Sequence, residues 1–98
     1  MTRRTLFRTL AVTPPQGQPM RLEYYLLTDP ARFDGGSLEV YGAEILLYRP
    51  DRKLPEIARA RGITPIGSRI MYILQHLCDG AVTPVGLPEV MDELLIKG

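Results

Sequence analysis

The chain contains only one cysteine, Cys78, and only one histidine, His76. A single cysteine excludes an intramolecular disulfide and a cysteine-based metal cluster, and a single histidine excludes a metal site built from several histidines. The two residues stand two positions apart in a predicted helix, so their side chains point about 200° apart and share neither a metal ion nor a catalytic role. We interpret Cys78 as a small buried hydrophobe and His76 as a solvent-facing residue.

The chain also lacks the motifs of several common active sites. It contains no Walker loop, no G-x-G-x-x-G and no H-E-x-x-H. No apolar run approaches the roughly 20 residues that a helix needs to span a bilayer. Near the N-terminus, Arg8 and Thr9 interrupt the apolar stretch that a signal peptide needs. We therefore expect a cytoplasmic protein that is not an enzyme, with no cofactor, no bound metal and no membrane association.

Length and composition are those of one ordinary globular domain. The chain has 98 residues, of which 45% are hydrophobic and 23% charged, and its formal net charge is +1. This length is enough for one hydrophobic core and not for two, so we expect a single domain over 1–98. The small net charge argues against an acidic solvating tail and against a histone-like polycation.

Hydrophobic residues at every second position predict an antiparallel sheet of three to four strands. The clearest strand places Tyr24 in the core and Tyr25 on the opposite face. Asp29-Pro30 is expected to end that strand, and Pro55 restricts the fourth strand to a sheet edge or to the start of the strand. We expect the strands at about residues 5–12, 20–28, 37–48 and 55–61.

Within the third strand, the apolar positions change phase at Gly42. An internal glycine often marks a bulge because it tolerates positive φ, so we predict a bulge or a sharp bend there. The alternative is a strand that is covered on both faces around Ile45–Leu47.

Two helices are predicted in the last third of the chain. The first runs over about 65–79, with Thr64 as its cap and Pro65 at its first position. Gly80 is expected to take the left-handed conformation after its end. The second is expected as one turn over 83–87 and a regular helix over about 88–95, because Pro88 lacks an amide; a start at Pro84 is the alternative. The first apolar stripe contains Ile66, Ile70, Ile73, Leu74 and Leu77, widened by Met71, and the second contains Leu87, Val90, Met91, Leu94 and Leu95. The expected fold is α+β, with the sheet covered by these two helices.

Three segments resemble a small family of uncharacterised bacterial proteins, mainly from Firmicutes, that is catalogued as a domain of unknown function. They are Tyr24–Leu27, with the sequence YYLL, Tyr41–Ile45, with a YGxEI pattern, and Val82–Leu95, which contains a PxxLxxVxxxL helix. Pro88 departs from the family pattern. The resemblance implies a fold and implies no activity, catalytic residue or cofactor.

The first functional hypothesis is a protein-interaction or regulatory module that binds an unidentified protein partner through a sheet edge or through the C-terminal helices. It rests on a chain that can fold but lacks catalytic groups. The candidate binding residues are Tyr25 on the sheet and the acidic residues Glu89, Asp92 and Glu93 of the last helix. Homodimerisation through an exposed strand or the last helix stays open.

The alternative is a nucleic-acid-binding protein that uses the basic N-terminus and the basic turn before and within the fourth strand. The acidic second helix argues against a recognition helix, because that element would approach phosphates. The candidate contacts are Arg3, Arg4, Arg8, Arg52, Lys53, Arg59 and Arg61.

Overall fold

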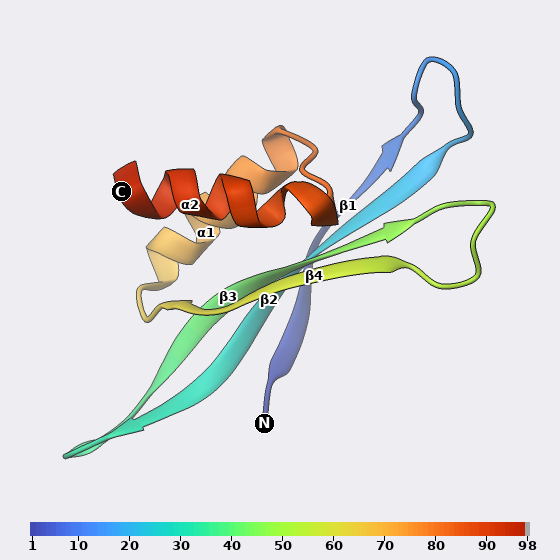
Figure 1. The fold of residues 1–98 in the computed structure, drawn as a ribbon. Coiled ribbons are helices and arrows are strands. Elements are labelled where there is room, and N and C mark those ends of the chain that lie inside the picture. The colour runs from blue at the N-terminus through green and yellow to red at the C-terminus, as the bar shows by residue number, and fades with distance from the viewer. Residues whose placement is uncertain (98) are drawn as a thin grey trace.

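The computed structural model describes residues 1–97. It has two layers, a four-stranded antiparallel sheet and two helices that lie on one face of that sheet (Figure 1). The elements are β1 (Arg3–Val12), β2 (Met20–Phe33), β3 (Gly36–Tyr48), β4 (Glu56–Thr64), α1 (Gly67–Asp79), the 3-10 turn η1 (Pro84–Gly86) and α2 (Leu87–Lys97). The predicted α+β fold, with four antiparallel strands followed by two helices, is confirmed.

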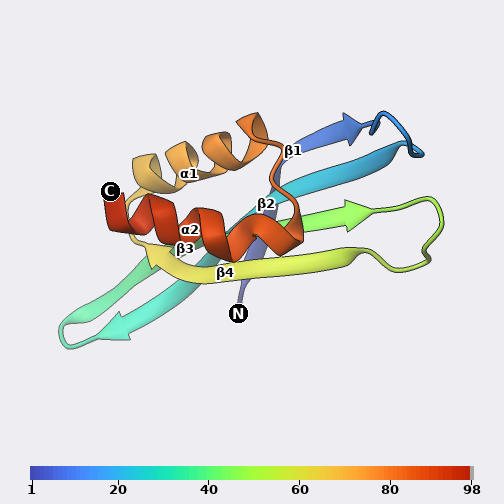
Figure 2. The ribbon, with the colours of Figure 1, turned by 45° about the horizontal axis from the view of Figure 1, so that its top comes forward.

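The strands follow one another across the sheet in the order β1-β2-β3-β4, so β1 and β4 form its two edges. Leu22 lies opposite Leu47, and Tyr24 lies opposite Ile45, on the two central strands. Because opposed residues of an antiparallel pair share a face, these side chains form the apolar surface on which the helices pack. Figure 2 shows α1 and α2 side by side over this face, with α2 next to β4.

The core lies between this face and the helices. Tyr24 is fully buried, as predicted, and its hydroxyl donates a 2.9 Å hydrogen bond to the Val82 carbonyl between the helices. Cys78 is a buried free thiol and His76 is exposed, also as predicted. The buried cluster consists of Leu22, Tyr24, Ala43, Ile45, Leu47, Ile70, Ile73, Leu74, Leu77, Cys78, Leu87 and Met91.

Strand β2 continues to Phe33, so the prediction that Asp29-Pro30 ends it is wrong. β1 pairs with β2 only as far as Thr28, and beyond that residue β2 pairs with β3. Pro30 therefore lies in a stretch of β2 with a free edge, which is where a sheet tolerates proline. The chain reverses at Asp34-Gly35 instead, and Gly35 supplies the positive φ of 94° that this turn uses.

The ladder between β3 and β4 changes register at Gly42, which confirms the predicted irregularity. Its cause is a close approach of two backbones and not a positive φ at Gly42. A Cβ on this residue would lie 2.2 Å from the carbonyl oxygen of Ala60, whereas the positive φ, 62°, belongs to Gly62 on β4. The alternative prediction also holds, because every residue from Gly42 to Leu47 is buried.

Helix α1 begins at Gly67, two residues later than predicted. β4 extends through Thr64, which is buried, and the hydroxyl oxygen of Thr64 accepts a 3.1 Å hydrogen bond from the Ile66 amide. Thr64 therefore ends a strand and holds the turn, and it does not cap the helix. Ile66 precedes the helix and so is not part of its buried stripe.

The ends of the two helices differ in part from expectation. α1 ends at Asp79, as predicted, but the residue with positive φ is Ala81, at 46°, and Gly80 has a φ of −89°. The predicted single turn before the last helix is present as η1, and α2 begins at Leu87. Pro88 then lies in the first turn of α2, where a missing amide costs no hydrogen bond.

Three apolar residues that their spacing assigns to buried stripes are exposed, namely Ile66, Met71 and Leu95. Met71 lies one turn before Gln75, whose side chain contacts Arg8 on β1, and Leu95 lies near the end of α2. Within residues 1–97, no helix has both the length and the apolar character needed to cross a membrane.

Candidate functional site

The face of the sheet opposite the helices, here called the open face, carries a connected cluster of polar side chains. Alternation along β2 directs Tyr25 to this face, because Tyr24 points into the core. The register then places Leu6, Tyr25, Glu44 and Arg59 in one row that crosses all four strands. Figures 1 and 2 both show the two helices on the other side of the sheet.

Glu44 stands at the centre of this row, and its side chain has no exposed surface. Arg4 donates from its Nε a 2.7 Å hydrogen bond to Oε1 of Glu44, and Arg59 donates from its Nε to Oε2. A buried carboxylate is costly unless it is paired and hydrogen-bonded, and here each oxygen has its own guanidinium. The hydrogen bond to Glu44 is also the main cause that raises the pKa of Arg4 above its usual value.

Tyr25 links this pair of arginines to a second polar group. The guanidinium of Arg4 lies 4.1 Å from the centre of the Tyr25 ring, and the Tyr25 hydroxyl donates a 3.0 Å hydrogen bond to Glu23. Partial burial, followed by this hydrogen bond, raises the pKa of the Tyr25 hydroxyl. Arg21 continues the series, with its Nε 3.4 Å from Glu23 and its guanidinium 4.3 Å from the Tyr48 ring centre.

Apolar side chains surround these polar ones on the same face. Leu6 on β1 and Ile57 on β4 are 52% and 47% exposed. Leu46, which lies opposite Ile57, and Leu27 are almost fully buried although no helix covers them. Neighbouring side chains of the open face must therefore shield them, as long arginine side chains do when their stems lie on apolar surface.

The residues of the nucleic-acid hypothesis are divided among several places. Arg4 and Arg59 contact Glu44, Arg61 lies 3.8 Å from Asp29, and Arg3 lies 3.3 Å from Glu39. Arg8 points to the helix side, where it donates a 3.3 Å hydrogen bond to Gln75. Arg52 and Lys53 lie in the turn between β3 and β4. The structure thus brings together Arg4 and Arg59 and does not join all seven residues in one surface.

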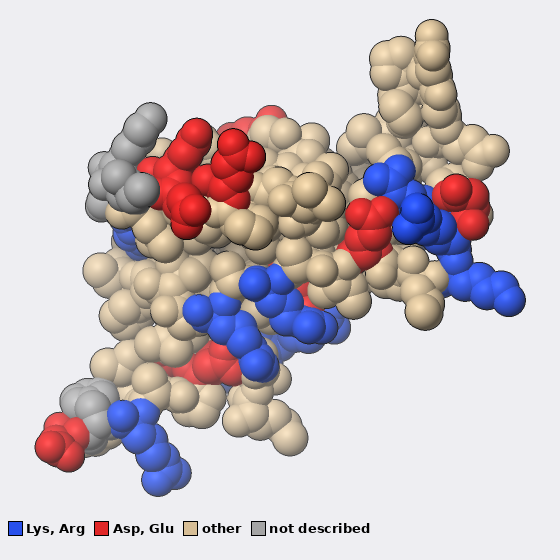
Figure 3. All heavy atoms as spheres, viewed as in Figure 1, with Lys and Arg blue, Asp and Glu red and all other residues tan. Residues whose placement is uncertain are grey.

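The residues of the protein-binding hypothesis lie on two surfaces. Glu89, Asp92 and Glu93 are exposed on α2, and Figure 3 shows acidic side chains gathered over that helix. Tyr25 lies on the other side of the sheet. The open face and the outer side of α2 are therefore separate candidate surfaces.

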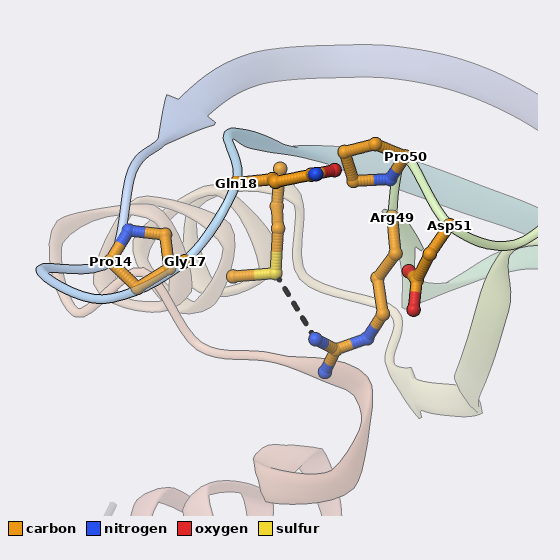
Figure 4. Close-up of a pocket in the computed structure, with 7 residues that line it drawn as sticks. Pro14, Gly17, Gln18, Arg49, Pro50 and Asp51 are labelled. Carbon is orange, nitrogen blue, oxygen red and sulfur yellow. Dashed lines mark hydrogen bonds between the residues drawn. The ribbon is translucent and has the colours of Figure 1, made fainter.

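A cavity of about 420 Å³ lies at the end of the sheet where the β1–β2 loop approaches the β3–β4 turn (Figure 4). Arg49 is its main charged group, and this side chain is already engaged: its Nε donates a 2.6 Å hydrogen bond to Glu56, and its Nη1 lies 3.3 Å from the sulfur of Met20. The lining residues are Pro14, Gly17, Gln18, Met20, Arg49, Pro50 and Asp51. Among residues 1–97, no group of three or more His, Cys, Asp or Glu side chains is placed to hold a metal ion.

Glu44 is the site residue that sequence reasoning missed. Its signal was an acid inside an otherwise apolar run, AEILLY, because an acid in a buried strand needs a cationic partner. The identity of that partner is not visible in the sequence, since Arg4 lies 40 positions away and Arg59 lies 15 positions away.

The model of a family described as "Family of unknown function (DUF6514)" matches residues 3–97, so the chain belongs to that family. The predicted resemblance to a family of unknown function is confirmed; its range in Firmicutes and the specificity of its motifs stay predictions. Comparison with curated proteins and with solved structures finds no match.

Proposed function

We propose that this member of a family of unknown function is a non-enzymatic, cytoplasmic protein-interaction module with a regulatory role, and that its open face binds the partner protein. The single observation that carries the proposal is the cluster around buried Glu44, in which Arg4, Arg59 and Tyr25 are held by mutual contacts. Tyrosine and arginine are among the residue types that most often dominate the binding energy of protein interfaces.

The geometry of the cluster favours binding because it is already ordered. Both oxygens of Glu44 are occupied, and Arg4 is held between Glu44 and the Tyr25 ring. Side chains that are fixed before association lose less conformational entropy when the partner arrives. The exposed Leu6 beside Tyr25, and the exposed Ile57, add the apolar contacts that accompany such residues at interfaces.

The test is capture of a partner from an extract of the native host, with the wild-type chain, Tyr25→Ala and Tyr72→Ala as baits. Tyr72 is a matched control, because it is 60% exposed and lies on α1, away from the open face. We expect one protein to be retained by the wild type and by Tyr72→Ala and lost with Tyr25→Ala. A partner that Tyr72→Ala loses and Tyr25→Ala keeps would place the interface on the helices.

A further bait, the double variant Glu89→Lys/Glu93→Lys, tests the outer side of α2, because it reverses two of the three exposed acidic side chains there. Loss of the partner with this double variant, and not with Tyr25→Ala, would move the interface to α2.

The nucleic-acid alternative is tested by titrating duplex DNA at low salt. We expect no binding, because Arg3, Arg4, Arg59 and Arg61 are already paired with acids. Binding that weakens steeply with salt would support the alternative instead.

A further inference from the structure

The two edge strands of the sheet are not equally protected. Pro55 precedes β4, and the β3–β4 ladder is interrupted where Gly62 takes a φ of 62°. η1 and α2 also pack against β4. Prolines, irregular registers and covering elements are the features by which proteins prevent an edge from pairing with another strand. β4 is therefore a blunted edge.

The edge formed by β1 has fewer of these features. Its sequence from Arg3 to Val12 contains no proline, and its one irregularity lies at Phe7. From Arg8 to Val12 it runs in continuous register with β2. Within residues 1–97, β1 pairs with β2 alone, so the outer backbone groups of the Arg8–Val12 segment face no other strand. This segment is called the β1 edge below.

The helix side of the β1 edge is apolar and incompletely covered. Leu10 and Val12 pack against the rim of the core and are only partly buried. Met71, on the same side of α1 as Gln75, is 46% exposed, and Gln75 is the residue that contacts Arg8. A further strand beside β1 would place alternate side chains next to Leu10 and Val12 and would remove this apolar surface from water.

The charge of β1 selects the kind of strand that can be added. β1 contains Arg3, Arg4 and Arg8 and no acidic residue. Because β1 contains no acid, β1 of a second copy of the chain offers Arg8 no carboxylate, whereas an acidic strand does. Arg8 is the arginine that remains open to a new ion pair, because its hydrogen-bond partner is the neutral side chain of Gln75.

We propose that the β1 edge accepts an extended acidic segment of a partner protein as a fifth strand. Main-chain hydrogen bonds to the Arg8–Val12 segment give affinity, and side chains at alternate positions give specificity. The segment carries an acidic residue opposite Arg8 and apolar residues opposite Leu10 and Val12. This inference rests on the proposed function, since both require a protein partner, but it uses residues other than those of the open face.

The experiment is selection of peptides from a random peptide library, with the full chain as bait, followed by synthesis of the enriched peptides. We expect the enriched sequences to combine acidic residues with β-branched or aromatic residues at every second position. On binding, backbone amides of β1 should gain protection from hydrogen exchange, while those of β4 should not. Added salt should weaken the binding of the wild-type chain.

Two charge reversals make the test specific. Arg8→Glu should weaken the selected peptides about tenfold or more, because it turns attraction into repulsion at the edge. Arg52→Glu, the same change in the β3–β4 turn, should leave binding within about twofold. If Arg8→Glu does not fold, the salt dependence and the exchange protection of the wild-type chain serve as the test.

The proposal is overturned if no peptide is enriched, if the enriched peptides lack acids, or if protection appears on β4 or the helices. It is also overturned if the chain proves to be a dimer paired through β1. A host partner that depends on Tyr25 and not on Arg8 would support the proposed function while rejecting the fifth strand. Peptide binding at β1 without such a partner would support the fifth strand while rejecting the open face as the interface.

Discussion

Glu44 and Arg59 lie opposite each other on β3 and β4, and the Glu44 side chain has no exposed surface while the Arg59 side chain is 53% exposed. The acid is thus buried within the sheet, whereas its two cationic partners, Arg4 and Arg59, are partly exposed to solvent. This asymmetry makes Glu44 the fixed element of the open face and makes the arginines and Tyr25 the groups that a partner protein would meet.

The first prediction concerns the stability that the Glu44 pair provides. Glu44→Gln should lower the free energy of unfolding by about 1–3 kcal/mol, because an amide nitrogen would face an arginine donor in place of a carboxylate oxygen. Urea denaturation measures this change. The matched control is Glu39→Gln, because Glu39 and its partner Arg3 are both more than half exposed. Exposed pairs contribute about 0–1 kcal/mol to the free energy of unfolding. An equal loss in both variants would show that burial does not make the Glu44 pair more stabilising than an exposed pair.

The second prediction concerns the close approach of β4 to Gly42. Gly42→Ala should destabilise the chain by about 2–4 kcal/mol, because its Cβ would lie 2.2 Å from the Ala60 oxygen and 2.9 Å from the Arg61 Cα. Gly67→Ala is the control: a Cβ there meets no atom within 4 Å, and alanine favours helix. The two melting temperatures should therefore move in opposite directions, and a parallel decrease would contradict the register of β3 and β4.

The third prediction concerns alkaline pH. Burial raises the pKa of Tyr24 above its ordinary value of 10.0, so the folded chain keeps a neutral phenol that the unfolded chain ionises. The contribution of Tyr24 to the free energy of unfolding should be fully retained below about pH 10 and should fall above it, by at most about 1.4 kcal/mol per pH unit. Denaturation midpoints of wild type and Tyr24→Phe measure the difference in slope.

The fourth prediction concerns the reactivity of the thiol. Cys78 is buried, and desolvation is the main cause that raises the pKa of its thiol, so little thiolate is present near neutral pH. A thiol-specific chromogenic reagent should label the native chain slowly, at a rate set by opening of the fold, and should label the urea-unfolded chain rapidly. Fast labelling of the native chain would mean that the helix layer does not cover Cys78.

Much of the fold follows from local patterns in the sequence. Period-two hydrophobicity predicts β2 clearly, and the turn residues between the segments separate it from the other strands. The buried Tyr24 and the exposed His76 follow from the phase of their elements. Pro88 correctly predicted a short turn before the last helix, because a missing amide has a local effect. Family membership added a fold and no chemistry.

The errors occurred where a residue's role depends on a distant segment. Pro30 stays in a strand because β1 ends its pairing before reaching that position, and Thr64 belongs to β4 because β3 still offers a partner there. The cluster around Glu44 depends on the same long-range register. Propensity and capping rules use only residues that are close in sequence, so they assign Pro30 and Thr64 the structure that each residue prefers locally.

Docking of a protein on the open face is tested most directly by the dissociation constant of the partner captured from the host. Titration of that partner against the wild-type chain, Tyr25→Ala and Tyr72→Ala compares two tyrosines on opposite layers of the molecule. We predict a loss of about tenfold or more for Tyr25→Ala and a change within about twofold for Tyr72→Ala, at unchanged folding of both variants. Equal dissociation constants for the wild type and Tyr25→Ala would contradict docking on this face.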